Sequence, residues 1–226
     1  MREIILDTET TGLEPAKGHR IVEIGAIELI NHLPTGQTYH VHINPEREVP
    51  REAEAVHGLS TKFLSDKPVF ATIAEAFLAF IADSVLIIHN ASFDLGFLNA
   101  ELGYLGKAPI LSARVIDTLM LARQKHPMGP NSLDALCKRY GVDNSRRSKH
   151  GALLDSELLA EVYIELIGGR QTALSLATSS GKPRATRQTH ITTRPRPLAS
   201  RLNDLERLSH AKLVEELGSA ALWKTL

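Results

Sequence analysis

The stretch REIILDTETTG, residues 2 to 12, decides the fold, because an aliphatic run ends in two acids two positions apart. Ile4, Ile5 and Leu6 are typical of a buried β-strand. Side chains two apart on a strand point to the same side, so Asp7 and Glu9 face one point and could share a hard divalent cation such as Mg²⁺. The alternative is a pair of solvated acids at a strand end, and this motif alone does not separate the two.

The segments that follow predict an α/β domain with a mixed sheet. Ile21–Ile30 and Thr38–Ile43 are expected to be strands, with turn residues around Pro34 to Gly36 that indicate an antiparallel hairpin. Beyond them strands and helices alternate. The expected strands are Val85–Ile88 and Val115–Leu119, and the expected helices are Ile73–Ala82, Asp94–Leu105, Ser132–Tyr140 capped by Asn131, and Ala152–Ile167 closed by Gly168 and Gly169.

The composition changes beyond residue 170, which we take as the end of the first domain. Residues 177 to 200 are rich in Ser, Thr, Pro, Gly and Arg and contain no acid, so residues 171–200 are expected to include a flexible linker. Residues 201–226 form a third segment, for which a short C-terminal helix is expected. Its apolar residues recur at roughly helical spacing: Leu202, Leu205, Leu208, Val214 and Leu217.

The charge is unevenly distributed along the 226 residues. Lys plus Arg balance Asp plus Glu at 26 each, but residues 171 to 226 hold 9 basic residues against 4 acids, which leaves the first 170 residues with a net charge of −5. An acidic domain that binds phosphates needs cations to offset its carboxylates. No apolar run approaches the roughly 20 residues of a membrane span, so a cytoplasmic protein is expected. The single cysteine, Cys137, excludes an intrachain disulfide and is expected in the core.

A second acidic position follows the strand Val85–Ile88, in the sequence His89-Asn90-Ala91-Ser92-Phe93-Asp94. If this strand lies beside the first one, Asp94 lies at the same sheet edge as Asp7 and Glu9. Capping of the following helix is the alternative role for Asp94. His89 and Asn90 are expected to stabilise the turn by hydrogen bonds.

A third position combines His150 with Asp155. Five residues along a helix would place the two side chains about 140° apart, so His150 is expected in the loop that precedes the helix. From there it could fold back toward Asp155, and the near-neutral pKa of histidine suits it to take a proton from an attacking water. A loop histidine without function, flanked by Arg146, Arg147 and Lys149, is the alternative.

Together these motifs resemble the DEDD exonuclease superfamily, in the subtype with histidine at the fifth position, and most of all the proofreading (epsilon) subunits of bacterial replicative DNA polymerases. The matching residues are Asp7-Thr8-Glu9-Thr10-Thr11-Gly12, Asp94, and His150-Gly151-Ala152-Leu153-Leu154-Asp155. The resemblance covers about residues 1 to 170 and implies an RNase-H-like fold and a 3′→5′ exonuclease.

The resemblance also implies the role of each site residue. Asp7, Glu9 and Asp155 would hold one Mg²⁺ or Mn²⁺ ion, Asp7 would touch a second, and Asp94 would support the site through water. His150 would be the general base. Two such ions can stabilise both the incoming hydroxide and the departing 3′ oxygen of a phosphodiester.

Three further residues are candidates for other roles. The segment Ala55-Val56-His57-Gly58-Leu59 resembles the one that lies against the terminal nucleotide in this family, so His57 could contact the substrate. A histidine at a helix end is the alternative. Thr10 lies next to the acids and could touch the last phosphate or sugar. Asp117 is expected to be a structural hydrogen-bonding acid rather than a metal ligand.

The expected partners are a single-stranded or frayed 3′ end of DNA and, through the C-terminal segment, a polymerase catalytic subunit. Gln171-Thr172-Ala173-Leu174-Ser175-Leu176 resembles the short peptides that bind sliding clamps, with an ordinary linker as the alternative. Two other functions remain open for the whole chain: an oligoribonuclease or RNase-T-like exoribonuclease with the same five residues, and an inactive replication scaffold.

Overall fold

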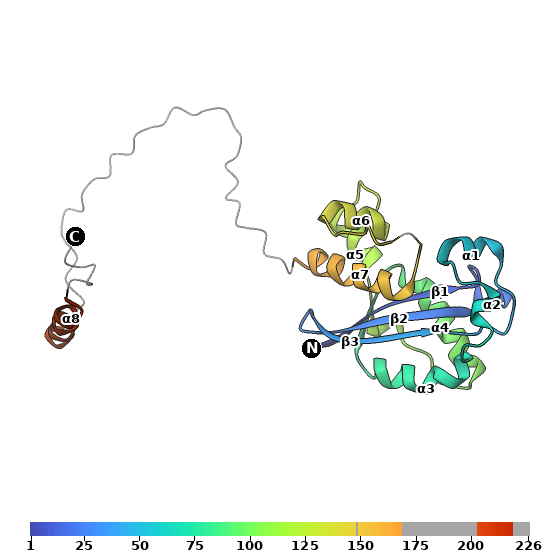
Figure 1. The fold of residues 1–226 in the computed structure, drawn as a ribbon, viewed down its shortest axis with the longest axis horizontal. Helices are drawn as coiled ribbons and strands as arrows, with labels where there is room; N and C mark the ends of the chain where they lie inside the picture. The colour runs from blue at the N-terminus through green and yellow to red at the C-terminus, as the bar shows by residue number, and fades with distance from the viewer. Residues whose placement is uncertain (148, 169–202, 219–226) are drawn as a thin grey trace, which may run out of the picture. The chain divides into compact units, whose positions relative to one another are not determined.

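The central element of the fold is β1 (Arg2–Thr10), which lies in the middle of a five-stranded sheet of order β3-β2-β1-β4-β5. The computed structural model describes residues 1–147, 149–168 and 203–218. β2 (Ile21–Ile30) pairs antiparallel with β1 and with β3 (Leu33–His42), whereas β4 (Val85–Ile88) pairs parallel with β1 and with β5 (Val115–Asp117). The mixed sheet predicted from the sequence is therefore confirmed (Figure 1).

The two faces of the sheet are covered by different helices because side chains alternate along β1. Ile4 and Leu6 pack into a core with α3 (Phe70–Ile81) and α4 (Ala91–Tyr104). Ile5 points the other way and packs with α7 (Ala152–Leu166). Figure 1 shows the sheet between α7 and α3. Asp7 and Glu9 lie two and four positions after Ile5 on the same strand, so their side chains are on the α7 face as well.

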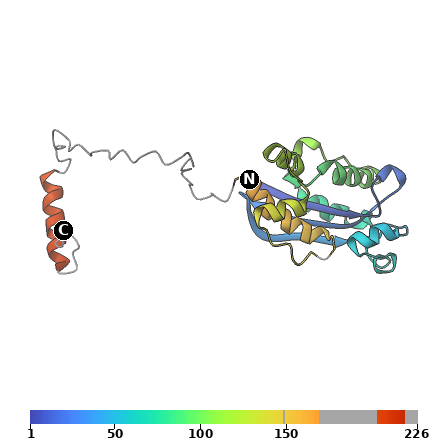
Figure 2. The ribbon, with the colours of Figure 1, turned by 90° about the horizontal axis from the view of Figure 1, so that it is seen from above.

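The remaining helices of this unit are short, and they line the ends and edges of the sheet. One group packs around α7 and includes the buried Cys137, as the sequence predicted. Figure 2 shows the layers from above. These elements are α1 (Arg51–His57), α2 (Thr61–Leu64), α5 (Thr118–Lys125), α6 (Leu133–Tyr140) and the 3₁₀ turns Pro15–Lys17 and Ser112–Arg114.

The predicted hairpin between β2 and β3 exists, but its turn is not at Pro34 to Gly36. The chain reverses at Asn31 and His32, both of which have positive φ, the conformation that two-residue hairpin turns require. Pro34 instead lies within β3. A proline is tolerated there because β3 is an edge strand, where a missing N–H breaks no ladder on the open side.

Several predicted boundaries were wrong, and two of them moved because of capping side chains. The ends of β3, α3 and α4 also differ from those predicted. β5 ends at Asp117 rather than Leu119, because the Asp117 carboxylate accepts hydrogen bonds from Leu119 N and Met120 N and starts α5. α6 is capped by Ser132 rather than Asn131, through its hydroxyl and Ala135 N. β1 also runs on to Thr10, which places the two acids inside the strand.

The described C-terminal residues form α8 (Asp204–Glu216), the helix expected from the spacing of its leucines. Asn203 and Glu206 form a reciprocal capping box at its start. Leu205 and Leu208 are 77% and 68% exposed. By its internal contacts the chain divides into units Met1–Ser175 and Leu176–Leu226. Gln171–Leu176 and the predicted linker lie outside the described residues. None of the described helices is long and apolar enough to cross a membrane.

A close contact at Gly25 fixes α7 on the sheet. A Cβ atom on Gly25 would lie 2.2 Å from the backbone C of Ala152 and the backbone N of Leu153. The approach is held by hydrogen bonds on either side, from Ser156 Oγ to Gly25 O at 3.0 Å and from Ala152 N to Glu23 Oε2 at 3.1 Å. Since Gly25 is the cross-strand partner of Asp7, this contact brings the start of α7 close to the acids of β1.

We predict that Gly25→Ala lowers the free energy of unfolding by about 3 kcal/mol, because the added methyl group must push the backbone of α7 away from β2. The same displacement should carry Asp155 of α7 away from Asp7 and Glu9 of β1. Urea denaturation measures the change. Gly103→Ala is the matched control, because a Cβ atom there meets nothing within 4 Å. Equal stability of the two variants would contradict the role of Gly25.

Candidate active site

The start of α7 brings a histidine and two acids together on the α7 face of the sheet. Asp155 is in the first turn of α7 and His150 is in the loop before it, as predicted. One ligand atom each from Glu9, His150 and Asp155 lies within 4.8 Å of the others. His150 Nδ1 is 3.2 Å from Asp155 Oδ2. Its backbone N–H donates to Val56 O at 3.2 Å, which anchors the histidine loop to α1.

Asp94 approaches the same strand from the opposite face of the sheet. It lies in the first turn of α4, buried, and its Oδ1 accepts hydrogen bonds from Thr8 N at 3.0 Å and Thr8 Oγ1 at 2.7 Å. Because β4 and β1 are parallel neighbours, the structure places Asp94 at the end of the sheet that carries Asp7 and Glu9. Asp94 does not cap its own helix, since Asn90 occupies that position.

The carboxylates raise one another's pKa values. Burial and then the charges of Asp94, Glu9 and Asp155 hold the pKa of Asp7 well above its ordinary value. Burial, followed by the charges of Asp155 and Glu23, raises the pKa of Glu9 to about 8. Burial also raises the pKa of Asp94 to about 7. Such a cluster favours either bound protons or a bound cation.

Oxygen atoms dominate this donor set, which fits Mg²⁺ or Mn²⁺. Asp7, Glu9 and Asp155 supply carboxylates from two elements that the Gly25 contact holds together. The residues present therefore fit the divalent metal that the resemblance implies.

Arg147 is the functional residue that the sequence did not single out. Its Nε and Nη2 donate to the two oxygens of Asp155 at 2.6 and 2.8 Å, and its Nη1 donates to Asp134 at 2.7 Å. Nη2 also lies 2.7 Å from His150 Nδ1, which must accept because a guanidinium only donates. Arg147 thus provides the positive charge next to Asp155, and a metal ion would compete with it for the same oxygens. Nothing in the run of basic residues before His150 distinguished it.

Two cavities open at this cluster. One of about 420 Å³ is lined by Glu9, Thr10, His57 and Phe93, with residues of the loop after β1. The other, of about 600 Å³, is lined by Asp7, Asp155 and His150 together with Arg123 and Arg147. The first is mainly apolar at its surface and the second carries basic side chains. An apolar surface suits the base of a nucleotide, and basic side chains suit its phosphate.

His57 and Thr10 differ in the hydrogen-bonding capacity that remains to them. His57 is the last residue of α1, and its Nδ1 accepts from Leu59 N at 3.0 Å. Its Nε2 therefore carries a proton, yet this buried atom has no hydrogen-bond partner. Thr10 Oγ1 already donates to Gly12 O at 2.6 Å. His57 is thus the helix-end histidine, and its Nε2 is buried beside the backbone of Thr10 in the cavity wall.

Asp117, His89 and Asn90 have the structural roles predicted for them. Asp117 accepts from the backbone N–H groups of Asn90 and Ala91, both at 3.2 Å, as well as from α5. His89 Nδ1 lies 2.9 Å from Thr118 Oγ1. These contacts tie β5 to the turn that precedes Asp94.

The comparison with known families settles which proteins share this arrangement. The model of the exonuclease family, RNase_T, matches residues 4–163, which include every site residue named above.

The chain belongs to the exonuclease family.

Among its relatives is the DNA polymerase III subunit epsilon of Rickettsia conorii, which is 59% identical over 80% of each chain. The proteins of the same name from Salmonella typhimurium and Escherichia coli are 44% and 42% identical, and each match covers 99% of this chain and 97% of the relative. The predicted relationship to the epsilon subunits is therefore confirmed.

Solved structures of exonucleases share the fold. Exonuclease X in complex with 5′ overhanging duplex DNA superimposes with a TM-score of 0.57 at 26% identity, over 74% of this chain and 92% of that one. The nuclease domain of 3′hExo, a DEDDh family member bound to rAMP, superimposes with a TM-score of 0.65 at 17% identity, over 75% and 92%. The RNase-H-like exonuclease fold is confirmed.

We predict that Glu9 makes the free energy of unfolding decrease as the pH rises, in the absence of divalent cations. Its folded pKa of about 8 exceeds the ordinary 4.5, so its contribution is complete below pH 4.5 and is lost as the pH rises to about 8. Buried His57 and His89, whose pKa values are lowered, act in the opposite direction. The effect of Glu9 is therefore measured as the difference in the pH dependence of stability between the wild type and a variant without this carboxylate.

Urea denaturation in chelator at several pH values between 5 and 8 gives this difference. The slope of stability against pH should be more negative in the wild type than in Glu9→Gln, by up to about 1.4 kcal/mol per pH unit. Equal slopes would show that Glu9 has no raised pKa.

Proposed function

We propose that this exonuclease removes mispaired nucleotides from the 3′ end of DNA, as the proofreading subunit of a replicative DNA polymerase. The observation that carries the proposal is the convergence of Glu9, His150 and Asp155 next to Asp7, between a mainly apolar cavity and one lined by both acids and arginines. The near full-length match to epsilon subunits supports the choice of DNA and of the replicative polymerase.

In this proposal Asp7, Glu9 and Asp155 hold two Mg²⁺ or Mn²⁺ ions, and Asp94 holds β1 in place through Thr8. Bound divalent cations supply the positive charge that a phosphodiester needs as its bond to the 3′ oxygen breaks. A metal ion held by Asp155 would compete with Arg147 for the same carboxylate oxygens, and loss of that ion pair would free Nδ1 of His150.

His150 then takes the proton of the attacking water. Its side chain is about half exposed and so reaches solvent. A neutral imidazole with a free ring nitrogen is a suitable base near neutral pH.

The apolar cavity beside Glu9 is the proposed position of the terminal nucleotide. His57 Nε2, a buried donor for which the described residues offer no partner in hydrogen-bonding geometry, would donate to an oxygen of this nucleotide. Thr10 would contact it through its backbone. An unpaired end is required because the last nucleotide must leave its partner before its phosphate reaches the acids.

Digestion of 5′-labelled single-stranded DNA and RNA of one sequence tests the proposal. Stepwise shortening of the DNA in Mg²⁺, stopped by chelator, is the expected result. Faster shortening of the RNA would instead favour an exoribonuclease, and an intact substrate of both kinds would favour a replication scaffold.

Asp7→Ala should abolish this digestion and leave the fold intact, because the fold loses only a carboxylate that its neighbours repel. Asp83→Ala is the matched control, since Asp83 is exposed and precedes β4 at the other end of the sheet. Normal turnover of Asp7→Ala would refute the assignment of the site.

We also propose that the C-terminal segment binds the polymerase catalytic subunit through the exposed leucines of α8, and that Gln171–Leu176 binds the sliding clamp. A tether of this kind raises the effective concentration of the exonuclease at the primer end.

Removal of residues 171–226 should therefore spare hydrolysis of single-stranded DNA and eliminate binding to the polymerase and the clamp in a pull-down. Within the full chain, Leu205→Glu with Leu208→Glu should weaken only polymerase binding, and Lys212→Ala on the same helix is the control. Unchanged recovery of the polymerase by the truncated chain would disprove the tether.

A further inference from the structure

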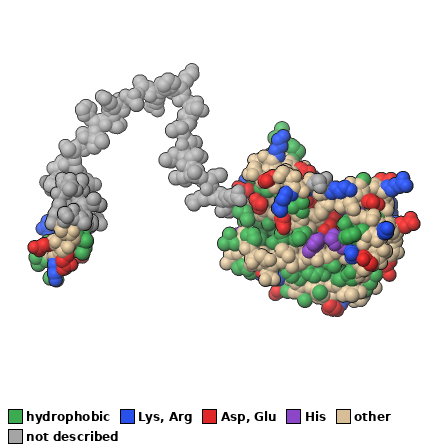
Figure 3. Space-filling view, viewed as in Figure 1, with side chains coloured by type: hydrophobic (Ala, Val, Ile, Leu, Met, Phe, Trp, Pro, Cys, Tyr) green, Lys and Arg blue, Asp and Glu red, His purple; other side chains and the backbone are tan. Residues whose placement is uncertain are grey.

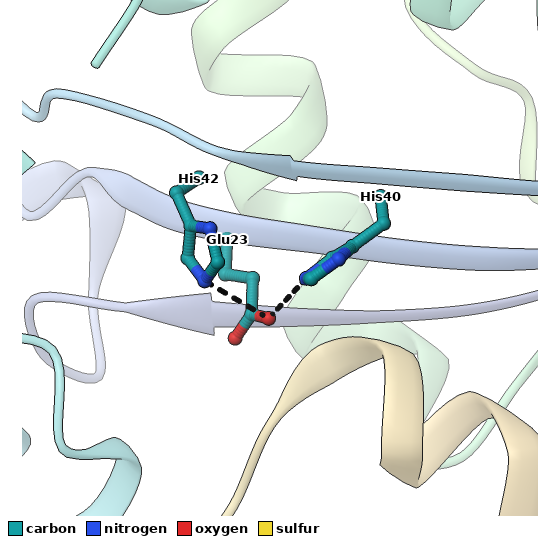
Figure 4. Close-up of side chains that lie close together, drawn as sticks. All are labelled: Glu23, His40 and His42. Carbon is teal, nitrogen blue, oxygen red and sulfur yellow. Dashed lines mark hydrogen bonds and ion pairs between the residues drawn. The ribbon is translucent and has the colours of Figure 1, made fainter.

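A second group of potential metal ligands lies on the α7 face of the sheet, outside the active site. Glu23 is on β2, and His40 and His42 are two positions apart on β3. His42 is the cross-strand partner of Glu23, and His40 is the partner of Gly25, so the three side chains share one face. Figure 4 shows both imidazole rings directed at the same oxygen of Glu23.

The distances are short enough for one ion to bridge the three side chains. Nε2 of His40 is 2.6 Å from Glu23 Oε1, and Nε2 of His42 is 3.5 Å from the same oxygen. One ligand atom from each residue lies within 4.8 Å of the others. The other oxygen, Glu23 Oε2, accepts from Ala152 N at 3.1 Å, so the carboxylate is oriented with Oε1 toward the histidines.

Exposure of the group leaves room for a water ligand. The Glu23 side chain is 6% exposed, whereas those of His40 and His42 are 36% and 27% exposed. Histidine side chains are visible at the surface near the start of α7 in the space-filling view (Figure 3). A buried carboxylate under two partly exposed imidazoles leaves an open position on the solvent side.

We propose that Glu23, His40 and His42 form a zinc site. Two imidazole nitrogens and one carboxylate oxygen, with water in the fourth position, are a common Zn²⁺ ligand set, and nitrogen ligands select Zn²⁺ over Mg²⁺. Each histidine would ligate through Nε2, the atom already directed at Glu23. Zn²⁺ binds histidine and carboxylate ligands in their deprotonated forms, so the affinity rises with pH.

The charges around the group favour a cation on balance. Glu9 is the cross-strand partner of Glu23 and adds a nearby acid. Lys67 opposes binding, and its charge, after burial, contributes to the lowered pKa of His42. Its effect is limited, because Lys67 is itself paired with Asp66 at 2.9 Å. Phe63 contacts the His42 ring edge to face at 5.1 Å and restricts its rotation.

An ion at this position would connect β2 to β3 and, through Glu23, to the first turn of α7. Zinc should therefore stabilise the element that carries Asp155 while leaving the active-site ligands free. This consequence does not depend on the substrate of the exonuclease.

The test measures Zn²⁺ bound to the full chain with the active site disabled. Asp7→Asn with Glu9→Gln removes two active-site carboxylates and imitates their protonated forms, so the fold is preserved. After chelator treatment, addition of Zn²⁺ and desalting, we expect one Zn²⁺ per chain and a higher melting temperature. Co²⁺ should give visible absorption bands from the same site.

His40→Gln or His42→Gln in this background should weaken Zn²⁺ binding by more than about tenfold, and cancel the rise in melting temperature. His126→Gln, which removes a histidine near α6, is the control and should bind Zn²⁺ normally. Circular dichroism confirms that each variant is folded. Absence of bound Zn²⁺, or binding unaffected by either substitution, would show that the three residues form only a hydrogen-bonded group.

Discussion

The contact of the first turn of α7 with Gly25 is the constraint on which the rest of the site depends. β2 has no side chain at this position, so the helix backbone reaches the sheet at a distance that any Cβ atom would prevent. The consequence is electrostatic, because the helix brings the buried Asp155 toward Asp7 and Glu9. Packing free energy from the aliphatic face of α7 opposes the repulsion that this arrangement creates.

Repulsion between these acids explains the other features of the site. Burial raises the pKa values of Glu9 and Asp94, and for Glu9 the charges of Asp155 and Glu23 add to it. Protonation of these acids, the ion pair of Arg147 with Asp155, and a divalent cation would each offset the negative charge. His150 is tied to this balance of charge, because its Nδ1 lies 2.7 Å from Nη2 of Arg147. Asp94 contributes to the site indirectly, because its hydrogen bonds to Thr8 hold the part of β1 that carries Asp7 and Glu9.

The sequence predicted the strands best, because their aliphatic runs are bounded by polar residues, and β2 and β4 have the expected ends. It also predicted that Asp7, Glu9, Asp94, His150 and Asp155 converge, since their motifs follow or precede elements that the fold brings together. It could not predict Arg147, which was one of several basic residues in a loop. The group of Glu23 with His40 and His42 was missed for a different reason. It depends on the register between β2 and β3, which is set by a turn at Asn31 rather than at the predicted Pro34 to Gly36.

The central claim is that the clustered acids hold protons until a divalent cation replaces them. Calorimetric titration of the full chain with Mg²⁺ near pH 7, in two buffers of different ionisation enthalpy, tests it directly. Mg²⁺ is the appropriate ion because the histidine-rich group should discriminate against it. At least one proton per chain should be released as the ion binds, because the pKa of Glu9 is about 8 and the pKa of Asp7 is raised as well. Binding without release of protons would contradict it.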